Sequence, residues 1–255
     1  MSVRRRLLIA SGILLLILVL GVSALYAVLK LSVLPLRDGA KLGGGSVTTV
    51  VAGHIGPIAI GAYVFDLASG GVGLIDAGLE PDAAAIRAAL ERMGKSSDDV
   101  RAIFLTHGHN DHSGGALAFP SAAVYVMQPD VHMVERLRAP DGRRVVVIRA
   151  LRDGERVEIS GTVVEVFGVP GHTPGSAAFL VNGVLFLGDS AASLWDGRVQ
   201  PNTLLSENAG QSVRSLGALA ERLRPSRGEI REIAFGHQGA VEGLDPLLKW
   251  KDSVR

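Results

Sequence analysis

The chain has no cysteine and almost no net charge. The absence of cysteine excludes disulfides, thiolate nucleophiles and cysteine-based zinc sites, so any bound metal ion must be held by nitrogen and oxygen atoms. Lysine and arginine number 26 against 25 acidic residues, which gives a net charge of +1, and the charges are scattered along the chain. Because proteins that track a phosphate backbone carry a basic stripe, nucleic acid is not an expected partner.

The length and composition favour one substantial domain. The chain has 255 residues, of which 47% are hydrophobic. This is enough for a single domain of α/β or sandwich type with an appendage.

The N-terminal residues differ from those of an ordinary soluble chain. Arginines at positions 4–6 precede an uncharged, largely apolar run over residues 7–29. At about 1.5 Å per residue, such a run can span a bilayer core of roughly 30 Å. We therefore predict a cytoplasmic stub at 1–6 and a transmembrane anchor at 7–29, with the rest of the chain outside the cytoplasm.

A cleaved signal peptide is the alternative interpretation of the same run. Small residues at 22–24 and 25–27 offer processing sites, and cleavage would give a secreted or periplasmic domain. After the run, residues 30–46 turn polar and contain three consecutive glycines at 43–45, which indicates a flexible linker. The globular domain is expected to cover residues 47–255.

Within this domain, apolar runs alternate with turn signals and amphipathic stretches. Helices are expected at 81–94 and 129–138 and after Asn208. Asn182-Gly183 is a strong hairpin signal between two of the strands. The predicted strands are 58–67, 73–76, 100–105, 123–127, 145–148, 156–159, 163–167, 177–181, 184–187 and 230–235.

Three histidines and one aspartate fall within six positions, directly after the apolar run that ends at Leu105. They are His107, His109, Asp111 and His112. In an extended or looped backbone His107 and His109 can point the same way, so both can bind one metal ion at about 2.0–2.1 Å. After the chain turns, Asp111 and His112 can face a second ion beside the first.

Three further candidate ligands follow other strand-like runs, and each is preceded by glycine. They are His172, Asp189 and His237. Side chains at strand ends converge when several strands finish at the same edge of a sheet. Asp189 has two carboxylate oxygens and can therefore bridge two ions.

These residues together resemble the metallo-β-lactamase superfamily, whose His-x-His-x-Asp-His signature matches positions 107–112. The similarity covers roughly residues 47–237 and includes the Leu-Ile-Asp-Ala-Gly segment at 74–78. The later Gly-His, Gly-Asp and Gly-His pairs follow in the family's order. The resemblance implies an α/β fold with four layers, an αβ/βα sandwich.

The resemblance also implies a ligand set for two metal ions. The first ion would be bound by His107, His109 and His172, the second by Asp111, His112 and His237, with Asp189 bridging them. Family members that hold an iron pair typically replace a histidine of the motif with a carboxylate, so the imidazoles here favour zinc, with iron and manganese as alternatives. Asp76 is expected to orient a ligand imidazole or the loop of His107, and turn capping is its alternative role.

The activity implied is hydrolysis of a small acyl compound. A water shared by two metal ions would lose its proton near neutral pH and attack an electrophilic carbon as hydroxide, oriented by Asp111. Thioesters and lactones are the expected substrates, as in hydroxyacyl-thioester hydrolases and lactonases of the superfamily. True β-lactamases generally lack a carboxylate at the position of Asp189, so β-lactam cleavage is an alternative. A non-catalytic metal-binding module at the membrane surface is another, and the oligomeric state stays open.

Three other residues are expected to lie outside the ligand set. His54, in a loop near the predicted mouth of the site, is interpreted first as a solvated loop residue and second as a substrate contact. His132 is expected at the surface of a helix. Ser190 has no adjacent base motif that would make it a nucleophile.

Overall fold

The computed structural model describes residues 15–16, 19–22, 32–145 and 148–254. Within these residues, no helix combines the length and apolar character needed to cross a membrane. The predicted anchor at 7–29 lies mostly outside the described residues, so it stays a prediction from the sequence.

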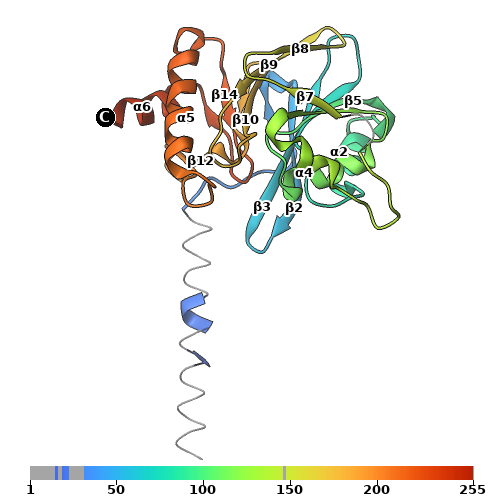
Figure 1. Ribbon diagram of the computed structural model, residues 1–255, viewed down its shortest axis with the longest axis horizontal. Coiled ribbons are helices and arrows are strands. Elements are labelled where there is room, and N and C mark those ends of the chain that lie inside the picture. The colour runs from blue at the N-terminus through green and yellow to red at the C-terminus, as the bar shows by residue number, and fades with distance from the viewer. Residues whose placement is uncertain (1–14, 17–18, 23–31, 146–147, 255) are drawn as a thin grey trace, which may run out of the picture.

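The first sheet has seven strands, which follow one another in chain order across the sheet. Neighbours from β1 to β4 are antiparallel, and those from β4 to β7 are parallel. Figure 1 shows β2 and β3 extending as a long hairpin beyond the rest of the domain. The strands are β1 (Lys41–Leu42), β2 (Val47–Ile55), β3 (Ile58–Asp66), β4 (Val72–Ile75), β5 (Val100–Phe104), β6 (Ala123–Met127) and β7 (Ile148–Leu151).

The second sheet has six strands in the order β15-β14-β11-β10-β9-β8. A separate two-stranded ribbon, β12 (Ala191–Ser193) and β13 (Val199–Pro201), follows β11 in the chain. The six strands are β8 (Arg156–Ile159), β9 (Thr162–Gly168), β10 (Ala177–Val181), β11 (Val184–Phe186), β14 (Glu232–Ala234) and β15 (Val241–Glu242).

Helices cover the outer face of each sheet and complete four layers. In Figure 1, α2 (Ala84–Arg92) and α4 (Val131–Glu135) lie on the side of the first sheet, and α5 (Ala209–Leu223) and α6 (Asp245–Ser253) lie on the side of the second. The short helix α3 (Asn110–Ser113) follows β5. One apolar core lies between α2 and the first sheet, one between the two sheets and one between the second sheet and the C-terminal helices. The expected αβ/βα arrangement is therefore present.

The alternation of side chains along β3 explains how one strand serves two cores. Tyr63 and Phe65 enter the core between the sheets, whereas Ala62 and Val64 enter the core under α2. Successive residues of a strand point to opposite faces of its sheet. Because both faces are buried, the strand is apolar throughout rather than alternating with polar residues.

The metal-ligand candidates follow strands whose C-terminal ends lie at one edge. β4 and β5 run parallel. β9 and β11 are both antiparallel to β10, and β14 is parallel to β11, so these three strands also end together. The two sheets meet at this edge, where Gly61 N donates to Gly236 O at 2.7 Å and Ala177 N donates to Thr106 O at 2.8 Å.

Several boundaries differ from the sequence predictions. Much of the predicted linker, 30–46, belongs to the domain: β1 pairs with β2, and Gly43 N donates to the Glu232 carboxylate at 3.1 Å. β7 begins three residues later than predicted. α4 is shorter than 129–138 at both ends: a 3₁₀ turn, Gln128–Asp130, precedes it, and it ends at Glu135. β2, the β12–β13 ribbon, β15 and α6 were not predicted.

Candidate metal centre

Tight turns after four strands bring the predicted ligands together. β5 leads to His107 and His109, β9 to His172, β11 to Asp189 and β14 to His237, while Asp111 and His112 lie on α3. Two glycines allow the close approach. A Cβ at residue 188, where φ is +50°, would lie 2.3 Å from Thr106 Oγ1, and one at residue 236 would lie 2.2 Å from Asp189 Oδ1.

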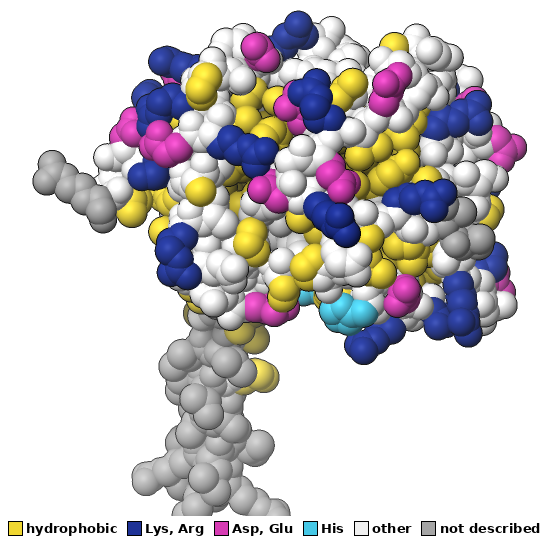
Figure 2. All heavy atoms as spheres, turned by 45° about the horizontal axis from the view of Figure 1, so that its top comes forward, with side chains coloured by type: hydrophobic (Ala, Val, Ile, Leu, Met, Phe, Trp, Pro, Cys, Tyr) yellow, Lys and Arg dark blue, Asp and Glu magenta, His cyan; other side chains and the backbone are white. Residues whose placement is uncertain are grey.

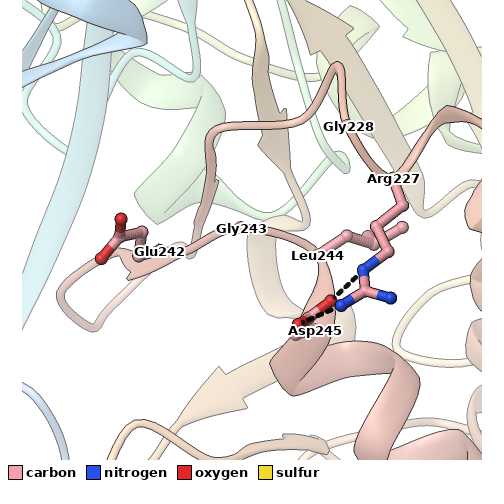
Figure 3. Close-up of a pocket in the computed structure, with 6 residues that line it drawn as sticks. All are labelled: Arg227, Gly228, Glu242, Gly243, Leu244 and Asp245. Carbon is pink, nitrogen blue, oxygen red and sulfur yellow. Dashed lines mark hydrogen bonds and ion pairs between the residues drawn. The ribbon is translucent and has the colours of Figure 1, made fainter.

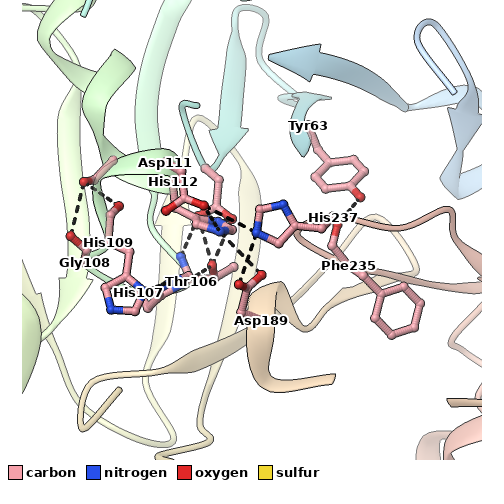
Figure 4. A network of polar contacts seen from close by, with 12 residues as sticks. Tyr63, Thr106, His107, Gly108, His109, Asp111, His112, Asp189, Phe235 and His237 are labelled. Carbon is pink, nitrogen blue, oxygen red and sulfur yellow. Dashed lines mark hydrogen bonds and ion pairs between the residues drawn. The ribbon is translucent and has the colours of Figure 1, made fainter. Parts of the chain in front are cut away.

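Three imidazoles form the first group, those of His107, His109 and His172, of which Figure 4 labels the first two. His107 Nε2 lies 3.0 Å from His109 Nδ1, and His172 Nε2 lies 3.2 Å and 3.0 Å from these two atoms. A neutral imidazole has only one N–H, so three converging rings do not satisfy one another well. Ligands at 2.0–2.1 Å around a tetrahedral ion lie about 3.3 Å apart, which is close to the spacing seen.

The second group combines Asp111, His112 and His237. His112 Nε2 lies 3.6 Å from an Asp111 oxygen, and His237 Nε2 lies 3.4 Å from the same oxygen. The His112 Nε2 atom is buried and has no hydrogen-bond partner among the described residues. A buried polar atom without a partner is costly unless an ion or water binds it, so this atom fits a metal ligand.

Asp189 lies between the two groups. Its Oδ1 is 3.4 Å from His112 Nε2, and its Oδ2 is 3.2 Å from His237 Nε2 and 3.7 Å from His172 Nε2. The carboxylate is therefore within ligand-to-ligand distance of imidazoles from both groups. The bridging role expected for Asp189 stays a prediction.

Burial and charge act in opposite directions on these side chains. Burial lowers the pKa of His107 and of His172. Burial also disfavours the protonated form of His237, but the nearby carboxylates of Asp111 and Asp189 outweigh this effect and raise the pKa of His237 to about 11. Although burial favours the neutral acid, the surrounding imidazoles hold the pKa of Asp189 well below its usual value. The ionised carboxylate of Asp189 is therefore stabilised by positive charge on its neighbours.

Asp76 lies beneath the cluster and is buried. Its carboxylate accepts hydrogen bonds from His112 Nδ1 at 2.8 Å, Thr106 N at 2.8 Å and the Thr106 hydroxyl at 2.9 Å. Since that hydroxyl donates to Asp76, it can accept from His107 Nδ1, which is 3.2 Å away. These contacts assign the N–H of both imidazoles to Nδ1 and leave their Nε2 lone pairs facing the cluster. Both roles expected for Asp76, orienting an imidazole and holding the His107 loop, correspond to contacts in the structure.

Asp130 connects the two ligand loops and was not predicted from the sequence. This buried carboxylate accepts from Gly108 N at 2.9 Å, from the Thr173 hydroxyl at 2.7 Å and from Gly175 N at 2.8 Å. It thereby ties the loop of His107 and His109 to the loop of His172. Its partners are up to 45 residues away, so no local pattern marks it.

Tyr63 and Ala59 hold the loop of His237, and this role was also not predicted. The Tyr63 hydroxyl donates to Phe235 O at 2.6 Å, and burial raises its pKa far above the usual value. His237 Nδ1 donates to Ala59 O at 2.8 Å, which leaves Nε2 facing Asp111 and Asp189.

The remaining candidates lie outside the cluster. His54 is exposed and pairs with Ala59 on the β2–β3 hairpin, next to the site but without a contact to the ligands that the structure records. His132 is exposed and donates to Pro129 O. Ser190 is buried and accepts a main-chain hydrogen bond from Asn202.

A cleft of about 460 Å³ lies at the other end of β14 (Figure 3). It is lined by residues 227–228 and 242–245, and an ion pair between Arg227 and Asp245 crosses it. Because Arg227 precedes β14 whereas His237 follows it, this cleft is separate from the metal-ligand candidates.

Two packed sheets between helices, with histidines and aspartates gathered at one edge, define an α/β sandwich able to hold a pair of metal ions. A family model described as the metallo-beta-lactamase superfamily matches residues 55–237. The chain belongs to this superfamily.

Curated relatives are similar over part of the chain. A hydroxyacylglutathione hydrolase from Aeromonas hydrophila is 35% identical over 136 residues, which cover 52% of this chain and 48% of the relative. Another from a Synechococcus species is 38% identical over 149 residues, covering 56% and 54%. The chain thus spans about half the length of the curated relatives it matches.

Solved structures show the same fold. A metallo-beta-lactamase family protein from Thermus thermophilus has a TM-score of 0.59 and 23% identity, covering 81% of this chain and 78% of its own. A B3 metallo-beta-lactamase with an active-site glutamic acid also has a TM-score of 0.59, with 19% identity and coverage of 90% and 91%. At these identities the likeness concerns the fold alone.

Proposed function

We propose that the chain is a metal-dependent hydrolase with two metal ions, most suitably zinc, that cleaves thioesters, lactones or related acyl compounds. The observation that carries this proposal is the position of Asp189 between two groups of potential ligands. Imidazole nitrogens with carboxylate oxygens form a ligand set that zinc accepts. The similarity to hydroxyacylglutathione hydrolases supports a thioester or a related carbonyl compound as substrate.

The side chains of this site have different roles. When bound, a pair of divalent ions supplies acidity to water and polarises a substrate carbonyl. Asp111 is the more solvent-accessible carboxylate, with 19% of its side chain exposed against 7% for Asp189. It can therefore orient a water by accepting its hydrogen bond, while Asp76 and Thr106 fix the imidazoles from beneath.

The charge distribution supports a small-molecule substrate over nucleic acid. On the face seen in Figure 2, lysine and arginine side chains are interspersed with aspartate and glutamate, and no stripe of one sign is visible. Together with the net charge of +1, this offers little attraction for a phosphate backbone.

The test is a hydrolysis panel of a thioester, a lactone and a β-lactam with the purified full chain, wild type and Asp189→Ala. Asp252→Ala, an exposed aspartate on α6, is the matched control. We expect one substrate class to be cleaved, with a strong loss of kcat in Asp189→Ala only. Cleavage that is indifferent to Asp189→Ala would contradict the dinuclear mechanism. Bound metal without turnover on any substrate would favour a non-catalytic module.

We further propose that residues 7–29 anchor the chain in a membrane with the domain outside the cytoplasm. The support is the uncharged apolar run preceded by three arginines. Fractionation of expressing cells, with N-terminal sequencing of the product, tests it. An intact N-terminus in the membrane fraction is expected, and cleavage after residues 22–27 would instead give an exported soluble domain.

A further inference from the structure

Exposed leucines lie on a loop that joins two turns of the metal centre. Asn202 N donates to Ser190 O at 3.3 Å, and Glu207 N donates to His172 O at 3.1 Å. Between these two anchor points, Leu204 is 92% exposed and Leu205 is 61% exposed. Exposed apolar residues that are scattered singly are ordinary, whereas a contiguous exposed apolar patch marks an interaction surface.

The tip of the β2–β3 hairpin presents a second apolar pair at the same edge. Ile55 and Ile58 face each other across the turn and are 48% and 42% exposed. Ile58 precedes Ala59, whose carbonyl accepts the hydrogen bond from His237. The stretches 55–58 and 201–206 contain no charged residue, and the nearest exposed acid on the second loop is Glu207.

The chain enters the domain at this same end. Gly239 N, two residues beyond His237, donates to Leu34 O at 2.8 Å. Trp195 N donates to Ser32 O at 3.1 Å, and the Trp195 side chain is 67% exposed. In Figure 1 the hairpin tip and the point of entry both lie on the lower side of the domain. Only two residues separate Ser32 from the apolar run that ends at residue 29.

From this arrangement we propose that the metal-centre end of the domain rests on a lipid surface. The contact would be made by an apolar rim consisting of Ile55, Ile58, Trp195, Leu204 and Leu205. The run at 7–29 supplies the reason to choose a lipid surface as the occupant, because it leads into the domain beside Trp195. Tryptophan is enriched at the boundary between membrane and water.

The orientation has a consequence for the substrate. A metal centre that opens toward a bilayer meets acyl compounds whose apolar chains lie in the lipid and whose carbonyl groups lie at its surface. Amphipathic acyl compounds are therefore the substrate class that fits this face. The inference rests on the membrane anchor and the hydrolase activity proposed above.

The test places a tryptophan on each end of the domain and measures its contact with lipid. Both natural tryptophans are replaced in the full chain by Trp195→Phe and Trp250→Phe. Into this background Leu204→Trp introduces a probe at the metal-centre end. Val163→Trp introduces a control near the start of β9, the strand whose other end precedes His172, and Val163 is likewise exposed. Each protein is reconstituted in phosphatidylcholine vesicles with and without brominated acyl chains, and co-flotation is measured first.

We expect both proteins to float with the vesicles and the bromolipid to reduce the emission of the Leu204→Trp probe alone. Flotation without selective quenching of that probe would overturn the inference. In that case the exposed leucines would contact another partner, such as a second copy of the chain, and the proposed anchor would still stand. Failure to float would show that the proposed anchor is wrong, and the inference would fall with it. Neither flotation nor quenching requires turnover. Failure of the proposed hydrolase activity can therefore be distinguished from failure of the membrane contact.

Discussion

Replacement of Asp76 by asparagine tests how the buried carboxylate beneath the cluster prepares the imidazoles. The carboxylate accepts from His112 Nδ1, Thr106 N and the Thr106 hydroxyl. Asparagine has a single acceptor oxygen, and its amide group is a donor. If that oxygen keeps the bond to Thr106 N, the amide faces the N–H of His112, and two donors meet in a buried site.

The magnitude follows from these contacts. A hydrogen bond to a charged group contributes about 1.5–3 kcal/mol, and a buried unsatisfied donor costs about 1–3 kcal/mol. We expect Asp76→Asn to lower the free energy of unfolding of the metal-free protein by about 2–4 kcal/mol. His112 can escape the clash by moving its proton to Nε2, which removes the lone pair that would bind the second ion. Metal affinity at that position should fall roughly 10–100-fold.

The assay is chemical denaturation of the metal-free protein together with zinc titration against a competing chelator. Asp66→Asn is the matched control, because Asp66 is exposed at the far end of β3. It should leave both quantities nearly unchanged. A zinc affinity for Asp76→Asn equal to that of wild type would refute the reasoning that this carboxylate fixes the tautomer of His112.

Three further perturbations have expected outcomes. Asp130→Asn should lower the free energy of unfolding by about 2 kcal/mol, because it weakens a buried acceptor that three donors share. It should also reduce binding of the first metal ion. The control Asp141→Asn changes an exposed residue and should leave both quantities unchanged. Tyr63→Phe should lower the free energy of unfolding by about 1–2 kcal/mol by leaving Phe235 O without its donor, and an unchanged value would contradict the role assigned to that hydroxyl. Chelation should lower Tm, because a ligand at about 1,000 times its Kd stabilises by about 4 kcal/mol, and calorimetry that shows the same Tm with and without chelator would contradict a resident metal.

Several strands were predicted well because they are apolar runs bounded by turn signals. β6 and β10 are continuous apolar runs, and β5 is apolar except for the exposed Arg101; the predicted and observed limits of all three agree closely. The hairpin between β10 and β11 was predictable because Asn182 and Gly183 accept positive φ, and both adopt it, at 52° and 77°. β7 was harder, since this edge strand carries the exposed Arg149 and Ala150 instead of an apolar run.

The candidate ligands were predictable because each lies beside its own local signal, a histidine-rich loop or a glycine before a polar residue. The residues that support them carry no such signal. Asp130 follows a proline and looks like an ordinary start of a helix, while its partners belong to other loops. Tyr63 is one apolar residue of a buried strand, and the carbonyl that it binds is 172 residues away. Contacts of this kind depend on the tertiary fold, which a single sequence does not display locally.

The lack of tertiary information in local sequence also explains why the start of the domain was placed at residue 47. Residues 43–45 resemble a flexible linker because glycine is common in linkers. In the structure Gly43 and Gly44 adopt left-handed φ of 59° and 68°, and the turn packs against β14 and its neighbours. Composition alone does not distinguish a glycine that confers flexibility from one that permits a tight turn.

We propose that two metal ions bind this cluster with Asp189 between them. The most direct test is an X-ray structure of the zinc-loaded chain with anomalous data collected at the zinc edge. Two peaks are expected, one for an ion bound by His107, His109 and His172 and the other for an ion bound by Asp111, His112 and His237. A single peak, or zinc bound elsewhere, would contradict this proposal.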